Sequence, residues 1–507
     1  MIEGYDVATV RVVEDRVRAG LPPGALMQRA ARALAQVVRD RVQELGARSV
    51  VVLAGPGDNG GDALWAASLL DGLQVTVVGV AARLHADGAT AAREAGVEVV
   101  EVAPDAGQLP ARAREALAAA DLVVDGLLGI GGRPGLRGAM AAAVAAVPGT
   151  AYIVGVDLPS GADPAGEDPQ GPRVRADETV TFGVAKPVHL LPATAPAVGR
   201  LRVVDIGLTP ELAGERPVVE RLEPADVAGR WPVPDATDHK YSRGVLGVVA
   251  GSDDYPGAAV LCCTAAVEAG AGMVRYLGPP RAADLVLASC PEVVPGPGRV
   301  QAMVVGPGVD ARGVDRPDGE DDQVDRVTGS FAQDLPLLVD AGGLELLGRW
   351  LAAGHRRTAP TLLTPHAGEL ARLLGTVADG EEVTREQVEQ APLAHARRAA
   401  VLTGCTVLLK GATTLVVTPD PAVPVRSQAD APPWLATAGA GDVLAGLAGV
   451  LLAAGLSPLE AGSLAALVHG TAASRATPGG PVRALGVAHA IPLAVADLLA
   501  GTAPRGR

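Results

Sequence analysis

Short runs of apolar, largely β-branched residues alternate with Ala-rich stretches from residue 49 to residue 205. The runs are apolar throughout rather than alternating with polar residues, which is typical of strands that helices cover on both faces. We therefore predict a doubly wound α/β domain, preceded by helical segments near 7–18 and 25–45. The predicted strands are 49–53, 75–80, 97–102, 122–125, 152–156, 178–182 and 201–205.

A polar stretch punctuated by five prolines, 209–238, interrupts this pattern and indicates a domain boundary. We place the first domain at 1–213, a linker at 214–234 and the second domain at 235–507. A second α/β series follows, and the acidic segment 310–325, which lacks periodicity, is interpreted as a solvated surface loop. The predicted strands of this series are 245–250, 273–277, 302–305, 335–340, 361–364 and 406–409, with helices at 441–454 and 458–476.

The charge and the aromatic content of the chain exclude some classes of binding partner. The 507 residues have a net charge of −14 and only 2% aromatic residues, which argues against nucleic-acid and anionic-membrane partners. No signal peptide is visible, and no uncharged run has the length and composition of a membrane span. The four cysteines lack metal-ligand spacing, so we expect reduced thiols in a cytoplasmic protein. Separately, we expect a homo-oligomer.

Lysine is rare among the basic residues of this chain. Only three of the 43 basic residues are lysines, namely Lys186, Lys240 and Lys410. Arginine is the default cation of this chain, so each lysine suggests a site that requires a compact ammonium group.

The first predicted strand runs into a glycine-rich loop, 55–61, that opens a helix. Backbone N–H groups at a helix N-terminus favour an anion such as phosphate. The spacing is neither Walker A nor a clean G-x-G-x-x-G, so a purely structural tight turn explains the loop equally well. The missing dinucleotide fingerprint also argues against an NAD-dependent dehydrogenase.

Two further strand ends add polar side chains to the same expected crevice. Asp125 and Asp157 end strands, and Ser160 follows closely. Together with Asn59 and Asp62 they supply carboxylate, amide and hydroxyl oxygens, which suit a hard cation. A helix cap or a turn is the commoner role of a strand-end Asp, and remains open for each residue taken alone.

The motifs GDNGGD, DGLLGIGGRPGLRG, DLPSG and TFGVAKPVHLLP resemble the epimerase domain of the NAD(P)H-hydrate repair family, which implies a Rossmann-like fold over about 1–213. The resemblance assigns potassium to Asn59, Asp125 and Ser160. Asp157 is the candidate catalytic acid–base group, because it lies at a strand end that faces the ligand. Lys186 is expected to face the pocket, and Asp58 stands where the family has Asn. The hydrated nicotinamide nucleotide is expected to contact Asp58, Asn59, Gly60, Gly61, Asp62, Gly129, Ile130, Gly131, Gly132, Arg133, Pro134, Gly135 and Asp157.

In the second domain, the segment WLATAGAGDVLAGL provides the strongest signal. A Gly-Ala-Gly turn at a helix N-terminus, with Asp442 in the first turn, can hold a transferring phosphate and present a carboxylate to a hydroxyl. The alternative is that Asp442 only caps its helix.

HKYSRG, YPGAA, GPG, TPHAGE, KGATT and GAGD resemble the ADP/ATP-dependent NAD(P)H-hydrate dehydratase domain, which is ribokinase-like. The resemblance implies Mg²⁺, catalysis by Asp442, and hydrate contacts from Ala258, Gly308, His366 and Asp442. His366 could equally be a satisfied core residue. Gly342 departs from the family's Asp-Ala-Asp. The residues expected to bind ADP or ATP are Lys410, Gly411, Ala412, Thr413, Thr414 and Gly441.

The two resemblances together imply a bifunctional enzyme that epimerises R and S NAD(P)HX and dehydrates the S epimer to NAD(P)H. Its nucleotide co-substrate would be ADP or ATP, consumed through a phosphorylated intermediate, and its substrates would be NADHX and NADPHX. The main alternative is a vitamin or pyrimidine kinase of the same superfamily, fused to a non-catalytic ligand-binding domain. That alternative leaves the complete set Asn59, Asp125, Asp157 and Ser160 without a role.

Overall fold

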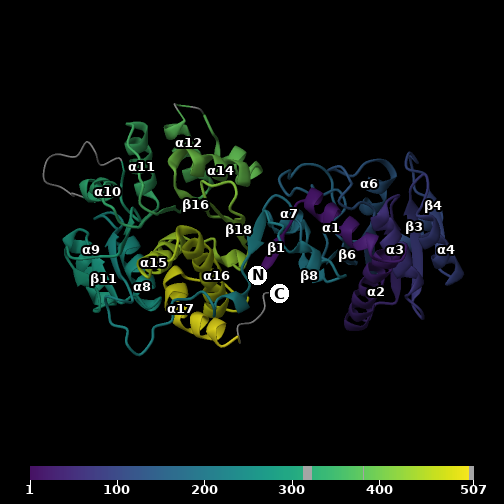
Figure 1. Cartoon of the computed structure of the whole chain (residues 1–507), viewed down its shortest axis with the longest axis horizontal. Helices are drawn as coiled ribbons and strands as arrows, with labels where there is room; N and C mark the ends of the chain where they lie inside the picture. Colours follow the sequence, from purple (N-terminus) through teal and green to yellow (C-terminus); the bar gives the residue numbers. More distant parts are fainter. Residues whose placement is uncertain (312–322, 379, 381, 502–507) are drawn as a thin grey trace. The chain divides into compact units, whose positions relative to one another are not determined.

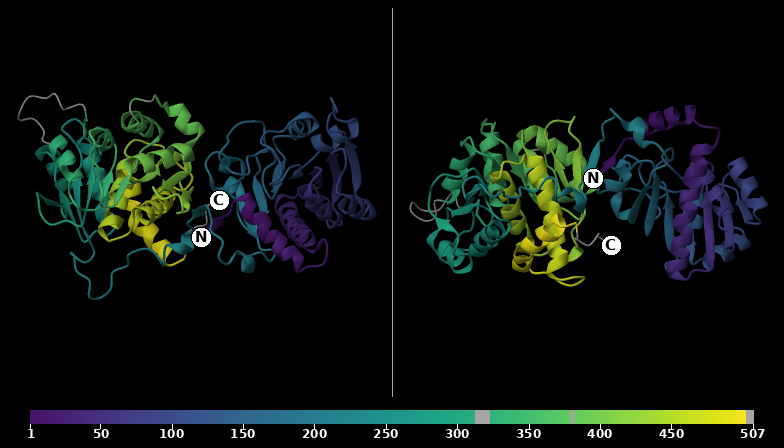
Figure 2. Two further views of the ribbon diagram at one scale, coloured as in Figure 1. Left: turned by 45° about the horizontal axis from the view of Figure 1, so that its top comes forward. Right: turned by 60° about the horizontal axis from the view of Figure 1, so that its bottom comes forward.

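The computed structural model describes residues 1–311, 323–378, 380 and 382–501, so most of the predicted loop 310–325 lies outside the described residues. The chain divides into two compact units, residues 3–219 and residues 220–507, and the second also contains residues 1–2 (Figure 1). In each unit the strands lie between helices (Figure 2). The two doubly wound α/β domains predicted from the sequence are confirmed.

The N-terminal unit is built on a fully parallel seven-stranded sheet of order β4-β3-β2-β5-β6-β7-β8. This is the Rossmann-type arrangement, and the strand order reverses between β2 and β5. The elements are α1 (Val7–Ala19), α2 (Ala25–Leu45), β2 (Ser49–Ala54), α3 (Asp58–Ser68), β3 (Gln74–Val80), α4 (Ala86–Glu94), β4 (Glu98–Val102), α5 (Ala111–Ala118), β5 (Leu122–Gly126), α6 (Gly138–Ala145), β6 (Tyr152–Val156), β7 (Glu178–Phe182), α7 (Pro187–Leu190) and β8 (Arg200–Val204).

Two apolar cores cover the two faces of this sheet. One joins α2, α3 and α4 to residues such as Val52 and Val124, and the other joins α5 and α6 to residues such as Val51 and Val123. Successive residues of a strand point to opposite faces, so a strand buried on both faces must be apolar at every position. This explains why the apolar runs predicted the strands so closely.

The C-terminal unit has a sheet of order β1-β9-β18-β17-β16-β15-β14-β13-β10-β11-β12. Its parallel part runs from β12 to β16, while β17 and β18 are antiparallel. The elements are β1 (Ile2–Gly4), β9 (Val219–Arg221), β10 (Val245–Val249), α8 (Pro256–Glu268), β11 (Met273–Tyr276), α9 (Pro280–Ser289), β12 (Val294–Pro295), β13 (Ala302–Val305), α10 (Gln323–Phe331), β14 (Leu337–Val339), α11 (Gly342–Ala352), β15 (Thr361–Leu363), α12 (Ala367–Val377), α13 (Arg385–Gln390), α14 (Pro392–Thr403), β16 (Thr406–Leu409), β17 (Thr414–Val417), β18 (Val425–Gln428), α15 (Ala440–Ala453), α16 (Pro458–Ala476) and α17 (Ala484–Leu499).

Part of the segment 214–234, which was expected to link the two domains, lies in the second sheet. Strand β9 lies beside β18, where the backbone N–H of Leu222 donates to Gln428 Oε1 at 2.7 Å. The amino group of Met1 also belongs here, since it lies 3.0 Å from Glu223 Oε2 and 2.8 Å from Asp226 Oδ2. The compact N-terminal unit therefore extends to Val219, six residues beyond the expected domain end.

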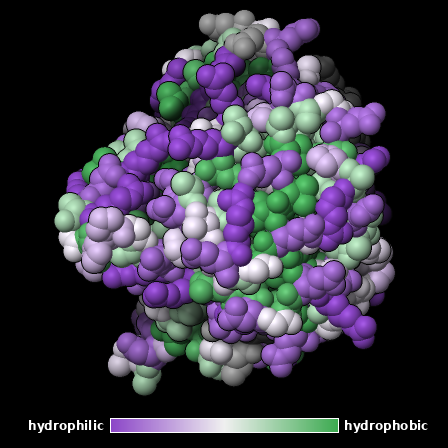
Figure 3. All heavy atoms as spheres, turned by 90° about the vertical axis from the view of Figure 1, so that its right-hand side faces the viewer, coloured by the Kyte–Doolittle hydropathy of each residue, from purple (hydrophilic) through white to green (hydrophobic). Residues whose placement is uncertain are grey.

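None of the described helices is long and apolar enough to cross a membrane. On the face drawn in Figure 3, hydrophilic residues surround and interrupt a band of apolar ones. All four cysteines are buried and free.

Candidate active sites

The glycine-rich loop of the N-terminal unit lies at the reversal point of its sheet, between β2 and β5. A Cβ at Gly55 would lie 1.8 Å from the carbonyl oxygen of Leu127, and one at Gly60 would lie 2.1 Å from the carbonyl oxygen of Gly55. Only glycine permits this close packing of the two strand-end loops. Gly55 and Gly60 therefore meet a structural need of the turn, while other residues of the loop form one wall of a cavity.

This cavity has a volume of about 1010 Å³ and opens at the carboxyl ends of the strands. Arg133, Pro134 and Gly135 do not line it, nor do Gly60 and Gly61, which are buried at the start of α3. The predicted substrate residues that line it are Asp58, Asn59, Asp62, Gly129, Ile130, Gly131, Gly132 and Asp157.

The three predicted potassium ligands converge on one dipeptide. Asn59 Nδ2 donates to the carbonyl oxygen of Leu128 at 3.0 Å, and Ser160 Oγ accepts from the N–H of Leu128 at 2.8 Å. Asp125 accepts from the N–H of Ser160 at 2.8 Å and from that of Leu127 at 3.4 Å. Burial raises the pKa of Asp125 to about 6, although these hydrogen bonds act to lower it. The site thus holds a buried carboxylate for which no cationic side chain is present among the described contacts.

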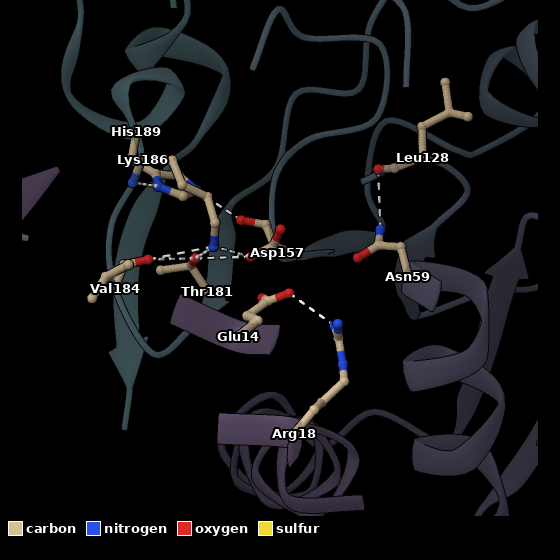
Figure 4. Close-up of polar contacts among 9 residues, drawn as sticks. All are labelled: Glu14, Arg18, Asn59, Leu128, Asp157, Thr181, Val184, Lys186 and His189. Atoms are coloured by element: carbon tan, nitrogen blue, oxygen red, sulfur yellow. Dashed lines mark hydrogen bonds and ion pairs between the residues drawn. The ribbon is translucent and has the colours of Figure 1, made fainter. Parts of the chain in front are cut away.

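Asp157 is held by a buried ion pair. Lys186 Nζ lies 2.6 Å from Asp157 Oδ1, and Thr181 Oγ1 donates to the same oxygen at 2.9 Å (Figure 4). Burial works to raise the pKa of Asp157, but the attraction and hydrogen bond of Lys186 outweigh it and lower that pKa. The sequence-based expectation for Lys186 is therefore refined, because its ammonium group is directed at Asp157 and is only 1% exposed.

The backbone at Asp157 is itself unusual. Its φ of +63° lies in the left-handed region, which a non-glycine residue adopts only when the surroundings enforce it. The ring of His189 supplies one such constraint, since its Nδ1 accepts from the N–H of Lys186 at 2.9 Å. Its Nε2 therefore carries the proton and donates to the carbonyl oxygen of Asp157 at 2.7 Å.

Sequence reasoning missed Glu14, which lines the same cavity from α1. Burial raises the pKa of Glu14, and its carboxylate lies 3.0 Å from Arg18 Nη2. Figure 4 shows its side chain directed toward Asp157 and Lys186. A lone Glu in an amphipathic helix carries no sequence signal of such a position.

In the C-terminal unit, the loops after β13 and β14 meet. Gly308 has φ +66°, and a Cβ there would lie 2.6 Å from the Cβ of Ala258, which brings these two predicted hydrate contacts together. A Cβ at Gly342 would lie 2.0 Å from the carbonyl oxygen of Val309. A side chain at this position would therefore meet the backbone of the neighbouring loop.

Lys410, at the end of β16, joins several of the predicted residues. Its Nζ lies 2.8 Å from Asp340 Oδ1 and 3.7 Å from Glu369 Oε2. A Cβ at Gly441 would lie only 3.2 Å from the same nitrogen, so the N-terminus of α15 faces this ammonium group. Burial acts against the charged form of Lys410, but attraction to Asp340 and Glu369 outweighs it and raises the pKa.

Asp442 lies in the first turn of α15, after Gly439 with φ +86°. Burial, followed by repulsion from Asp340, raises the pKa of Asp442 to about 7, although Lys410 opposes the shift. No side-chain hydrogen bond from the described residues caps the N-terminus of α15, which weakens the alternative that Asp442 only caps its helix. A carboxyl group of this pKa can exchange a proton near neutral pH.

The remaining predicted nucleotide residues form the turn between β16 and β17, where Gly411 and Ala412 are exposed and Thr413 is buried. His366 is not a core residue, because its side chain is 53% exposed. Its Nδ1 caps α12 by accepting from the N–H of Gly368 at 3.0 Å, and a β-bridge pairs it with Lys410. His366 thus borders the same site.

Sequence reasoning also missed Asp340 and His469. Asp340 follows a correctly predicted strand, so its place at a strand end was the available signal. His469 is buried in α16, its Nε2 has no hydrogen-bond partner among the described residues, and burial lowers its pKa to about 4. It is therefore neutral, and the positive charge of Lys410 adds to the lowering of its pKa.

Comparisons with known proteins agree with this division. A family model described as NAD(P)H-hydrate dehydratase matches residues 246–485, and one described as YjeF-related protein N-terminus matches residues 23–188. The chain is 43% identical over 496 residues to the bifunctional NAD(P)H-hydrate repair enzyme Nnr of Mycobacterium leprae (strain TN), covering 94% of both proteins. It is 44% identical over 474 residues to the protein of the same name from Mycobacterium tuberculosis (strain H37Rv), covering 90% of both.

Two solved structures are similar to part of the chain. The ADP/ATP-dependent NAD(P)H-hydrate dehydratase from Bacillus subtilis, co-crystallized with ATP/Mg²⁺, is 24% identical with a TM-score of 0.46, covering 54% of this chain and 97% of that one. A ribokinase-like superfamily protein from Enterococcus faecalis V583 is 21% identical with a TM-score of 0.47, covering 55% of this chain and 96% of that one.

Proposed function

The chain belongs to the family of bifunctional NAD(P)H-hydrate repair enzymes, and from this membership we propose how its two units share the repair of hydrated nicotinamide nucleotides. The N-terminal unit interconverts the R and S forms of NADHX and NADPHX. The C-terminal unit dehydrates the S form to NADH or NADPH and consumes a nucleoside diphosphate or triphosphate.

The observation that supports the dehydratase most directly is the position of Asp442 in the first turn of α15, beside the Lys410–Asp340 pair. The ring hydroxyl of the hydrate is a poor leaving group. Asp442 accepts its proton while the oxygen attacks the terminal phosphoryl group of the nucleotide. The phosphate ester then leaves as phosphate with the C–O electron pair, and loss of a proton from the neighbouring ring carbon restores the double bond.

Lys410 and the N-terminus of α15 suit the transferring phosphoryl group. The ammonium group of Lys410 lies close to Gly441 at the start of α15, and both a cation and a helix N-terminus attract an anion. We assign the turn Lys410–Thr414 and Gly441 to the nucleotide, and Ala258, Gly308, His366 and Asp442 to the hydrate.

No group of three or more His, Cys, Asp or Glu side chains that could hold a metal ion occurs among the described residues. Magnesium commonly binds through substrate phosphates and one or two carboxylates, and Asp340 and Glu369 are the carboxylates nearest to Lys410. When bound with the nucleotide, it would neutralise charge on the phosphates.

In the N-terminal unit, Asp157 is the proposed acid–base group, because Lys186 keeps it ionised next to the cavity. Asn59, Asp125 and Ser160 fit a potassium ion, since they offer amide, carboxylate and hydroxyl oxygens around the buried, unpaired charge of Asp125. A bound monovalent cation would supply the missing positive charge and anchor ligand oxygens.

A single assay tests both activities. The full-length protein is incubated with an R/S mixture of NADHX and with ADP or ATP, and the return of reduced-nicotinamide absorbance is followed. We expect complete consumption by the wild type, whereas Asp157→Ala should consume about half quickly. Spontaneous epimerisation, measured without enzyme, is subtracted. Failure to regenerate NADH with either nucleotide would favour a small-molecule kinase fused to a non-catalytic domain.

ADP is the proposed preferred nucleotide, by resemblance to bacterial members of the family, and the same assay ranks ADP against ATP. A homo-oligomer is also proposed, and sedimentation of the full-length protein tests it. A cytoplasmic location is proposed because the four cysteines are free and buried.

A further inference from the structure

Glu14 projects from α1 into the N-terminal cavity, although nothing in the sequence motifs points to it. Its side chain is 19% exposed, and it lines the cavity together with Arg11 and Arg18 of the same helix. Figure 4 shows the carboxyl group of Glu14 directed toward the Asp157–Lys186 pair. The cavity therefore has an acidic side chain on each of two opposing elements, α1 and the loop after β6.

The surroundings of these two carboxyl groups shift their pKa values in opposite directions. Asp157 is paired with Lys186 at 2.6 Å, so its ionised form is favoured. Burial raises the pKa of Glu14, as does repulsion from Asp157, while Lys186 and Arg18 oppose the shift. Two carboxyl groups separated in this way can serve as the base and the acid of one reaction.

Asp62 also faces this cavity and is the rival for the acid role. Burial raises the pKa of Asp62 strongly, and repulsion from Asp157, Asp58 and Glu14 adds to the shift. Among the described residues no hydrogen bond or ion pair to its carboxyl group is recorded. Glu14, in contrast, has Arg18 Nη2 at 3.0 Å to stabilise the charge that remains after it gives up a proton. Glu14 can therefore release and recover a proton, whereas Asp62 is better suited to staying neutral.

We infer that Glu14 is the general acid of the epimerase unit, acting opposite the base Asp157. The inference rests on the proposed epimerase function and deepens it. Hydration places the hydroxyl on the ring carbon that is also bonded to the ring nitrogen, so this carbon can invert if its bond to nitrogen opens and closes again.

The proton balance of this step is simple. Asp157 takes the hydroxyl proton, the O–H electron pair becomes the second bond of an aldehyde, and the C–N bond breaks. The C–N electron pair goes to the ring nitrogen, which takes the proton of Glu14. Rotation about the adjacent C–C bond presents the other face of the aldehyde. Reclosure then reverses each transfer and returns both carboxyl groups to their starting states.

The test uses Glu14→Gln in the full-length protein, because glutamine keeps the shape and the hydrogen bond to Arg18 but has no proton to give. We expect a loss of about 10²-fold in kcat for epimerisation, the contribution typical of a positioned acid. The wild-type rate should fall as pH rises and Glu14 ionises, and the variant should lack this alkaline limb. Dehydration of pure S hydrate by the same protein should not change.

Glu115→Gln is the matched control, since Glu115 lies on α5 with a side chain that is 69% exposed. A second variant, Glu14→Ala, should recover epimerisation when formate or acetate is added, which lost stability alone would not produce. An unchanged alkaline limb in Glu14→Gln, together with its loss in Asp62→Asn, would overturn the assignment and give the acid role to Asp62. A wild type that does not epimerise would instead reject the proposed function itself.

Discussion

The two active sites contain the same components, a lysine, aspartates and a glycine turn at strand ends, but combine them differently. In the N-terminal unit Lys186 pairs directly with the reactive carboxylate Asp157 and keeps it ionised. In the C-terminal unit Lys410 pairs with Asp340, and Asp442 is left with a pKa of about 7. The two sites contain the same residue types, so the difference in carboxyl pKa comes from which aspartate pairs with the lysine. That pairing decides which carboxyl group can exchange protons near neutral pH.

This difference agrees with the two chemistries. Epimerisation by ring opening needs a base that is already ionised and a separate acid, the roles that we propose for Asp157 and Glu14. Phosphoryl transfer needs a carboxylate that takes up a hydroxyl proton and a nearby cation that attracts the nucleotide phosphates. We therefore propose a positioning role for the buried Lys186 and a ligand-binding role for the partly exposed Lys410.

Removing Lys186 should have the largest effect. In Lys186→Met, Asp157 becomes a buried carboxylate without its cation, which costs about 3–5 kcal/mol. The loss should be full at neutral pH and should diminish as pH falls and Asp157 becomes protonated, because Lys186 makes the largest of the contributions that lower the pKa of Asp157. Denaturant unfolding of the N-terminal unit at acid and neutral pH measures this. Lys240→Met, which removes an exposed lysine, should leave the transition unchanged, and an equal shift in both variants would contradict the ion-pair argument.

Replacement of Asp442 tests the second site. Asp442→Asn should reduce nucleotide-dependent dehydration by about 10²-fold or more, the typical loss for a positioned base, and leave epimerisation intact. Steady-state assays on pure S hydrate give the rate. Asp284→Asn, on the exposed face of α9, is the control. If Asp442→Asn dehydrates at nearly the wild-type rate, Asp442 serves only the structure of its helix.

The pKa of Asp442 also predicts a pH profile. Wild-type dehydration should fall as pH decreases through about 7, because the protonated carboxyl cannot accept the hydroxyl proton. Lys410→Ala should move this limb to higher pH, since Lys410 lowers the pKa of Asp442, and should raise KM for the nucleotide by about 10-fold, more than KM for the hydrate. Equal changes in both KM values would argue against a phosphate contact.

The smallest expected effect concerns Asp58, which lines the N-terminal cavity. Its charge should repel the phosphates of the hydrate by about 1 kcal/mol near the protein surface, so Asp58→Asn should lower KM for epimerisation a few-fold. Kinetics at low and high salt measure this, because screening should reduce the difference between the variant and the wild type. Weaker binding by Asp58→Asn would mean that the carboxylate makes a favourable contact.

The sequence by itself determined the strands, because burial on both faces requires continuous apolar runs, as in residues 50–54 of β2, residues 122–124 of β5 and the whole of β10. It also determined the glycine turns, since close backbone approach excludes any side chain at Gly55 and Gly306. Asp125, Asp157 and Asp442 could be predicted as site residues because strand ends and helix N-termini can be located from local patterns.

Tertiary structure alone decided the partners. The pairing of Lys410 with Asp340, 70 positions away, and the place of β9 in the second fold depend on contacts between distant segments. Local periodicity indicates that a residue faces a core or a surface, but not which group it will meet there. The protonation states depend on these tertiary contacts, because burial and neighbouring charges set the pKa values of Glu14, Asp157 and Asp442.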